Sequence, residues 1–433
     1  MIDFNRIFKE VENLDRERVM ELMRNLISID TTAPPGNSYR EYVDAISPYF
    51  RDLAFDLEEI TVPGELIKQI PIPLEGPRIN LVATKEFGKE NYITFCGHMD
   101  VVPASNDGNQ KWRFPPFVAT MIKSGKIYGR GVADNKGPMI SLILALQIID
   151  KLNLKPKYNI RVLNCTDEEI GFYPGIRYLA EQGYVKGTVY SIDFSVEPII
   201  LMGTAGDLEI DIKTIGRSSH SGLSFYGVNA LEEMVPILVE LMKLKKKIEA
   251  RQSKDIPSVL DNKTKEKDNL SPLFNLDIIK SGEKSNIIPD LCQLTINRRI
   301  IPDENIEEVK QEILDAIEIG KTKSNALDVK TSFKYSYPPL KVDIDNSEIK
   351  KIIKVIQLVN KIPEEKIYIT GLNLTFDVGF VAQILKTQKI ILRGAATLKS
   401  NTHGVNETIR LKDIKKSIKE IIVFLCADLE DLN

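Results

Sequence analysis

The 433-residue chain is poor in the residues that build compact thiol or histidine sites, with only four cysteines and three histidines. The cysteines are scattered and form no C-x-x-C pair, which disfavours a zinc-thiolate site or a disulfide framework. Each lies in an apolar run, so we predict four buried thiols at the following positions: Cys96, Cys165, Cys292 and Cys426.

Charge excess and long apolar runs are also absent. A formal net charge of −3 gives no general attraction to nucleic acid or to an anionic membrane. No run of 18 apolar residues is present, and the first residues are polar and helical in pattern, without the apolar core of a signal peptide. We therefore expect a cytoplasmic protein with no nucleic-acid partner and no membrane partner.

Three common catalytic signatures are missing as well. The chain has no G-x-S-x-G elbow, which argues against a serine hydrolase, and no H-E-x-x-H helix. The segment "GRGVAD" half-matches G-x-G-x-x-G, but Asp134 stands at the third glycine, so a dinucleotide site is disfavoured.

The pattern of elements predicts an α/β fold with an insertion. Strands at 78–85 and 91–100, a buried helix at 139–152 and further strand–helix alternation indicate a mostly parallel sheet. Between 206 and 337 the order becomes β-α-β-β-α-β, which is ferredoxin-like, with an exposed loop expected at 251–271. We predict a catalytic domain in two parts, 1–205 and 338–433, around an inserted α+β domain at 206–337.

Acidic side chains recur at the ends of the predicted strands or in the turns that follow them. They are Asp100, Asp134, Asp167, Glu168, Glu169, Asp193 and Glu197. Ligands bind outside the carboxyl ends of strands in open α/β sheets, and converging acids need a cation to neutralise them. His98 in "GHMD" and His403 in "NTHGVNE" would complete a ligand set suited to zinc or a similar ion. The third histidine, His220, lies in "GRSSHSG" in the inserted domain.

Taken together, these motifs resemble the two-zinc metallopeptidase family that includes aminoacylase, carnosinase, acetylornithine deacetylase, succinyl-diaminopimelate desuccinylase and glutamate carboxypeptidase. The resemblance spans nearly the whole chain. It rests on "GHMDVVP", "GRGVADNKGP", "TDEEIG", the acids around 193–197, "SSHSG", "SNIIPD", "NRRI" and "THGVNE". It implies that the inserted domain is a lid and dimerisation domain, so a homodimer is a possible partner arrangement.

The resemblance implies a role for each matching residue. His98, Asp134, Glu169 and His403 correspond to ligands of two divalent ions, zinc first, with cobalt or manganese as alternatives. Asp134 would bridge the ions. Asp100 corresponds to an acid that orients His98, and Glu168 to the general base. His220 corresponds to a lid histidine that stabilises the oxyanion, which in dimeric relatives comes from the partner subunit. Asn286 and Arg299 match positions that hold a substrate carboxylate, although Arg298 is an adjacent alternative.

The fifth ligand is ambiguous. In the dipeptidase branch it ends a strand as in "YSID", which points to Asp193; in the desuccinylase branch it is the Glu of "EP", which points to Glu197. We favour Asp193, because it directly ends an apolar strand.

The substrate is open between two amide classes. "DNKGP", with Pro138, and "KWRFPPF" resemble the dipeptidase branch and favour a short peptide with a free C-terminal carboxylate. Removal of an acetyl or succinyl group from an amino acid is the alternative within the same chemistry. A catalytically inactive relative that serves as a binding module is an alternative of another class.

Overall fold

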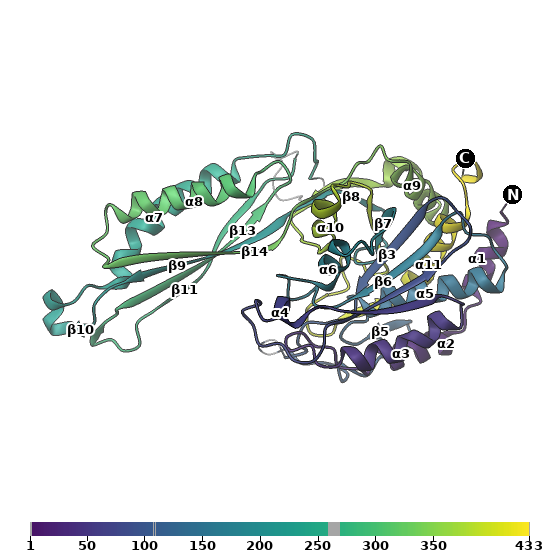
Figure 1. The fold of residues 1–433 in the computed structure, drawn as a ribbon, viewed down its shortest axis with the longest axis horizontal. Helices are drawn as coiled ribbons and strands as arrows, with labels where there is room; N and C mark the ends of the chain where they lie inside the picture. The colour runs from purple at the N-terminus through teal and green to yellow at the C-terminus, as the bar shows by residue number, and fades with distance from the viewer. Residues whose placement is uncertain (1, 107, 109, 259–268, 433) are drawn as a thin grey trace. The chain divides into compact units, whose positions relative to one another are not determined.

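The computed structural model describes residues 2–106, 108, 110–258 and 269–432, and the chain divides into two compact units (Figure 1). The first unit comprises Met1–Leu201, Val342–Ile369 and Phe380–Asn433, and the second comprises Met202–Lys341 and Thr370–Gly379. Residues 259–268 of the loop predicted at 251–271 lie outside the described residues, which resume at Asn269.

A six-stranded sheet organises the first unit, in the order β1-β2-β6-β3-β7-β17. Its strands are β1 (Asp56–Thr61), β2 (Ile79–Lys85), β3 (Tyr92–His98), β6 (Asn159–Cys165), β7 (Thr188–Ser191) and β17 (Ile390–Leu392). The four strands from β6 to β17 pair in parallel, but β2 runs antiparallel to both β1 and β6. The sheet is therefore mixed rather than uniformly parallel. Strand β6 is buried at every position, as expected for a sheet covered on both faces.

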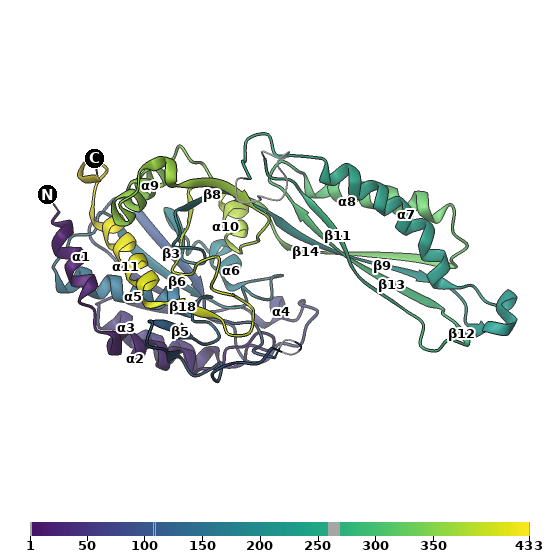
Figure 2. The ribbon, with the colours of Figure 1, turned by 180° about the vertical axis from the view of Figure 1, so that it is seen from behind.

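Helices surround this sheet (Figure 2). They are α1 (Phe4–Glu12), α2 (Arg16–Ile27), α3 (Tyr39–Arg51), α4 (Gly64–Ile67), α5 (Lys136–Lys151), α6 (Gly175–Glu181), α9 (Ser347–Asn360) and α11 (Leu411–Cys426), with short 3-10 turns η2 (Glu364–Lys366) and η3 (Glu430–Leu432). Helix α5 is buried on nearly all sides, as its apolar sequence predicts, because it packs between β3, α2 and α11.

Smaller elements complete the first unit and form the chain segments that lead from one unit into the other. A three-stranded sheet contains β4 (Thr120–Met121), β5 (Lys126–Tyr128) and β18 (Thr408–Arg410). A second one contains β8 (Ile199–Thr204), β15 (Leu340–Lys341) and β16 (Tyr368–Leu372), and α10 (Val378–Leu385) follows.

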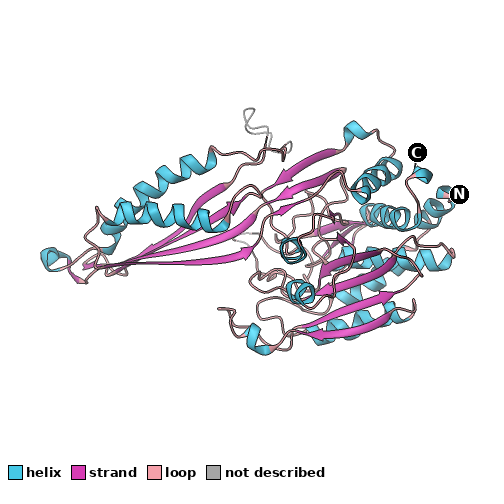
Figure 3. Ribbon diagram, turned by 45° about the horizontal axis from the view of Figure 1, so that its top comes forward, coloured by secondary structure: helices cyan, strands magenta, loops and turns pink. Residues whose placement is uncertain are grey.

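The second unit has the β-α-β-β-α-β order predicted from the sequence. It contains β9 (Gly206–Ile215), α7 (Ala230–Glu249), β11 (Leu273–Ser281), β13 (Leu291–Ile300), α8 (Ile306–Lys321) and β14 (Asp328–Tyr337). The antiparallel sheet order is β11-β13-β9-β14, and both helices lie on one face (Figure 3). Burial along β9 alternates strictly, because only that face meets the apolar core. A two-stranded ribbon, β10 (Ser219–His220) with β12 (Ile287–Ile288), and the turn η1 (Ser221–Tyr226) extend from it.

All four cysteines are buried thiols, as the sequence predicts. In the described part of the chain, no helix has the length and apolar character needed to cross a membrane.

Candidate metal centre

His98 is the last residue of β3 and is 1% exposed. Its Nδ1 lies 3.0 Å from the main-chain oxygen of Asp100. Since a carbonyl oxygen can only accept, Nδ1 carries the proton in this contact, and the lone pair of the neutral ring is left on Nε2. Nε2 points at Asp134 and lies 2.9 Å from its Oδ1. With a neutral ring this is the tautomer required of a histidine that binds a metal through Nε2. Without metal, the Asp134 carboxylate, which can only accept, favours a second proton on Nε2 and raises the pKa of His98.

Asp100 has a second task that the sequence does not reveal. Its carboxylate lies 3.6 Å from His98 Nδ1, farther than its main-chain oxygen. The two carboxylate oxygens instead accept the backbone N–H of Glu168, at 3.2 Å, and of Glu169, at 2.9 Å. Asp100 therefore joins the end of β3 to the turn after β6, and it fixes the backbone from which both glutamates project.

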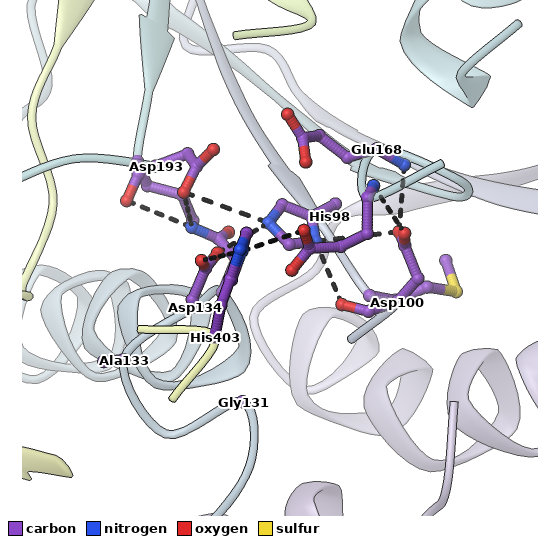
Figure 4. A network of polar contacts seen from close by, with 12 residues as sticks. His98, Asp100, Gly131, Ala133, Asp134, Glu168, Asp193 and His403 are labelled. Atoms are coloured by element: carbon purple, nitrogen blue, oxygen red, sulfur yellow. Dashed lines mark hydrogen bonds and ion pairs between the residues drawn. The ribbon is translucent and has the colours of Figure 1, made fainter. Parts of the chain in front are cut away.

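Asp134 stands between two histidines (Figure 4). One carboxylate oxygen, Oδ1, faces His98 Nε2 at 2.9 Å, and the other, Oδ2, faces His403 Nε2 at 3.2 Å. An aspartate whose two oxygens face different imidazoles has the arrangement needed to bridge two cations.

Glu169 and His403 form the other side of the cluster. Oε2 of Glu169 lies 3.0 Å from His403 Nε2. The second oxygen, Oε1, is buried and has no hydrogen-bond partner among the described residues. A buried carboxylate oxygen without a donor is costly unless a cation or water meets it. His403 is 57% exposed, so this side of the cluster is open to solvent.

The two candidates for the fifth ligand differ in their surroundings. Oδ1 of Asp193 lies 3.9 Å from His98 Nε2 and accepts a hydrogen bond from the Asn135 amide at 3.1 Å. Glu197 Oε2 instead accepts from Leu398 N at 2.8 Å and from Ser195 Oγ at 3.3 Å. Glu197 thus connects two loops, whereas Asp193 points into the cluster.

Three overlapping groups have ligand atoms within 4.8 Å of one another. They are His98–Asp134–Asp193, His98–Glu168–Glu169 and Asp134–Glu169–His403. His98, Asp134 and Glu169 each belong to two groups. The first and third groups share Asp134, so the arrangement can hold two cations side by side.

The titration of these groups reflects their burial and mutual repulsion. Burial and the negative charge of Asp134 raise the pKa of Glu169 to about 7 and also raise the pKa of Asp193. Burial alone would raise the pKa of Asp134, but hydrogen bonds with the two histidines lower it below its usual range. Hydrogen bonds between His403 and the carboxylates of Asp134 and Glu169 raise the pKa of His403 to about 10. Without metal, these contacts favour protonated histidines beside the acids, and divalent ions would take the place of those protons.

The first acid of the "TDEE" segment has partners outside the cluster. Asp167, which has a positive φ of 60°, accepts a hydrogen bond from Tyr39 Oη at 2.8 Å and pairs with Arg78 Nε at 3.2 Å. Its carboxylate anchors the turn that carries Glu168 and Glu169, and it enters none of the three ligand groups.

Two groups of supporting residues were not predicted from the sequence. One is Asn135, whose amide holds Asp193. The other is the buried pair Arg130–Glu407, with Nη1 and Oε2 2.7 Å apart. The available signal was the presence of strongly polar side chains inside the small-residue motifs "GRGVADN" and "THGVNE".

The remaining predicted site residues belong to the second unit. His220 is exposed, and its Nδ1 accepts the backbone N–H of Gly222 at 3.0 Å. Asn286 is exposed beside it, with its main-chain oxygen accepting from Ser221 N at 3.0 Å. Arg299 is partly exposed and lies 3.5 Å from Asp207, whereas Arg298 is buried against Glu304 at 2.5 Å. Arg299 is thus the arginine of the two that can meet a ligand.

Comparison with known proteins agrees with this geometry. The family model described as Peptidase family M20/M25/M40 matches residues 94–425. A probable succinyl-diaminopimelate desuccinylase of Staphylococcus aureus is 30% identical over 63% of this chain and 68% of its own. The dipeptidase Dug1p of Saccharomyces cerevisiae has the same fold, with a TM-score of 0.76 at 17% identity over 98% of both chains. Human carnosine dipeptidase 1 gives 0.73 at 18% identity, over 97% of this chain and 98% of its own. The chain belongs to the peptidase family M20/M25/M40, a family of metal-dependent hydrolases.

Proposed function

We propose that the protein hydrolyses the amide bond of a dipeptide or short peptide that has a free C-terminal carboxylate. The observation that carries this proposal is the placement of Asp134 between His98 and His403, with one oxygen facing each ring. His98 and Asp193 would hold one divalent ion, Glu169 and His403 the other, and Asp134 both. Zinc suits this set of imidazole and carboxylate ligands, and cobalt or manganese are alternatives.

The residues fit such ions. Glu169 Oε1 is buried without a hydrogen-bond donor among the described residues, and both Glu169 and Asp193 have raised pKa values. Two bound ions would neutralise these acids, polarise a scissile carbonyl and acidify a water molecule.

Glu168 is the proposed general base. It is 8% exposed, and its backbone is fixed by the hydrogen bond to Asp100. Its carboxylate would take the proton of the attacking water and then deliver it to the leaving amine. Asp100 would act through backbone hydrogen bonds to both glutamates and through its contact with the His98 ring.

His220 is the proposed oxyanion donor. Because its Nδ1 accepts from Gly222, the proton of a neutral ring lies on Nε2, which can donate to the oxygen of a tetrahedral intermediate. Asn286 and Arg299 would bind the substrate, Arg299 through a carboxylate.

The length of β13 bears on how these lid residues act. His220 lies in the β10–β12 ribbon and Asn286 directly precedes β12, close to the start of β13 at Leu291, whereas Arg299 lies near the end of β13. Eight residues of extended chain span about 27 Å, too far for one small substrate to touch both ends. This favours a homodimer in which His220 serves the partner's site, with the second unit as lid and dimerisation domain.

An exposed apolar row on α7 supports the same dimer. Its members are Leu231, Val235, Val239 and Met242, each between 41% and 51% exposed. Their spacing of three or four residues places them on one side of the helix. Light scattering on the purified protein tests this, with a monomer as the opposing result.

A second candidate function is removal of an acetyl or succinyl group from an amino acid. The S. aureus relative, a probable succinyl-diaminopimelate desuccinylase, favours it. Both reactions use the same ions, base and oxyanion donor, so the catalytic residues are equally suited to each. A cytoplasmic location is part of the proposal for either substrate.

The test is metal analysis combined with a hydrolysis screen. Dipeptides, including β-alanyl dipeptides, are compared with N-acetyl and N-succinyl amino acids, before and after chelation. We expect two ions per chain and chelator-sensitive cleavage of a dipeptide. Cleavage of acyl amino acids alone selects the deacylase. Bound metal without turnover of either class selects an inactive binding module, and failure to bind any divalent ion overturns the metal centre.

A further inference from the structure

The strongest unassigned feature is Glu407, a fully buried carboxylate four residues after His403. It accepts four hydrogen bonds. Oε2 receives Arg130 Nη1 at 2.7 Å and the backbone N–H of Gly131 at 3.1 Å, and Oε1 receives the N–H of Ala133 at 2.8 Å and of Asp134 at 3.2 Å. Both oxygens are therefore occupied by donors, and Glu407 is not itself placed to bind a metal.

Arg130 makes the corresponding contacts on the other loop. Its guanidinium is 2% exposed, and Nη2 donates to the main-chain oxygen of His403 at 3.1 Å and of Pro103 at 3.3 Å. The ring of Trp112 covers it, with the guanidinium carbon 5.3 Å from the ring centre. Arg130 comes from the segment that bears Asp134, and Glu407 from the segment that bears His403. Each side chain therefore crosses to the other ligand's segment.

The loop that carries His403 needs such support. His403 and Asn406 have positive φ angles of 62° and 65°, which residues other than glycine rarely adopt. Asn406 Oδ1 accepts from Arg113 N at 2.6 Å, and the Asn401 amide donates to Val405 O at 2.8 Å. These bonds hold the loop's backbone. The segment of Asp134 is joined to it by the Gly129 N–H, which donates to the main-chain oxygen of Glu407 at 3.3 Å, by the pairing of β5 with β18, and by the side chains of Arg130 and Glu407.

We propose that Arg130 and Glu407 are positioning residues that set the spacing between Asp134 and His403, and hence the affinity of the centre for its second ion. The inference rests on the proposed two-metal site. A carboxylate is required at position 407, because its four hydrogen-bond donors need two oxygens that both act only as acceptors. A glutamine would turn an NH2 group toward N–H donors. Arginine is required because its fork reaches Glu407 and His403 O together, which the single nitrogen of lysine cannot do.

The experiment measures metal affinity rather than turnover. Wild type, Glu407→Gln and the milder Arg130→Lys are stripped of metal and titrated with Zn²⁺ against a competing chelator. Visible spectra of the Co²⁺-loaded proteins report the ligand geometry. We expect each variant to bind the second ion about 10–100-fold more weakly, with an altered Co²⁺ spectrum, because partners of metal ligands contribute effects of that size.

A matched control is available in the second unit. Arg298 and Glu304 form another buried pair, with side chains 0% and 8% exposed. Glu304→Gln should lower the thermal stability of the metal-free protein as Glu407→Gln does, yet leave Zn²⁺ affinity and the Co²⁺ spectrum unchanged. Equal loss of affinity in Glu304→Gln, or wild-type affinity and spectrum in both Arg130→Lys and Glu407→Gln, overturns the proposal. Failure of wild type to bind two ions overturns the metal site itself and is thus a separate result.

Discussion

The sheets of the two units bury their strands in different ways. In the first unit every residue of β6 is buried, whereas along β9 of the second unit buried and half-exposed residues alternate without exception. A sheet covered on both faces excludes water from the ends of its strands, so charged groups there can interact strongly. A sheet covered on one face keeps its other face in contact with water. The difference is consistent with a largely buried acid–histidine cluster in the first unit and with the exposure of the predicted site residues His220 and Asn286 in the second.

The largest expected effect comes from a substitution in the buried cluster of the first unit. Glu168→Gln removes the proposed general base but keeps the size of the side chain and the backbone bond to Asp100. Turnover should fall by about 10²–10⁴, since general-base catalysis contributes that much. Steady-state kinetics and metal analysis of the same sample measure it. Metal content should match wild type, and retained turnover would remove Glu168 from the mechanism.

A substitution of His220 tests the role of the exposed residues of the second unit. His220→Ala should reduce kcat by about 10²–10³, the contribution of one oxyanion donor. Metal binding should not change, because His220 belongs to the other unit. Ser224→Ala, on the same exposed turn, is a suitable control and should behave as wild type. Loss of bound metal in His220→Ala would instead make this residue a ligand.

One core substitution in each sheet tests whether the two units unfold independently. Leu163 in β6 and Leu208 in β9 are both fully buried, so replacing either with alanine should cost about 2–5 kcal/mol in the free energy of unfolding. Leu208→Ala should weaken the second unit and leave metal affinity unchanged, while Leu163→Ala should weaken the unit that binds metal. Chemical denaturation, with and without Zn²⁺, measures both.

The control for that pair lies on the half-exposed side of β9. Lys213→Ala, on the face away from the core, should change stability by less than about 0.5 kcal/mol. Equal shifts of one shared transition in Leu163→Ala and Leu208→Ala would mean that the units unfold together.

Periodicity in the sequence predicts the half-buried strand β9, since strict alternation is a local pattern. The complete burial of β6 is not a local pattern, because its sequence includes the polar residues Asn159, Arg161 and Asn164. Periodicity also predicts that the acids at strand ends gather, because parallel strands end at one edge. It fails where the outcome depends on distant partners. The antiparallel direction of β2 is set by its pairing with β6, and no local feature of the β2 sequence indicates it.

The same limit applies within the site. The "TDEE" run gives Asp167 no distinguishing mark, yet Tyr39 and Arg78 draw its side chain away from the ligand groups. Glu407 stands out only as a polar residue in "THGVNE", and its role is not local, because its four donors come from a segment more than 270 residues earlier in the chain. Local patterns therefore point to the candidate ligands more readily than to the residues that position them.

The smallest expected effect is the release of protons when metal binds. In the metal-free protein the pKa of His403 is about 10, so its ring is protonated at pH 8, and contacts with Asp100, Asp134 and Asp193 raise the pKa of His98 as well. A metal accepts only neutral imidazole, so Zn²⁺ should displace at least the proton of His403 at pH 8. The pKa of Glu169 is about 7, so below pH 7 a further proton must leave, and affinity should fall more steeply as pH decreases. Calorimetric titration in buffers of different ionisation enthalpy counts these protons. Binding at pH 8 without any release would mean that the histidines do not balance the acids in the metal-free centre, and that the buried cluster is held neutral in some other way.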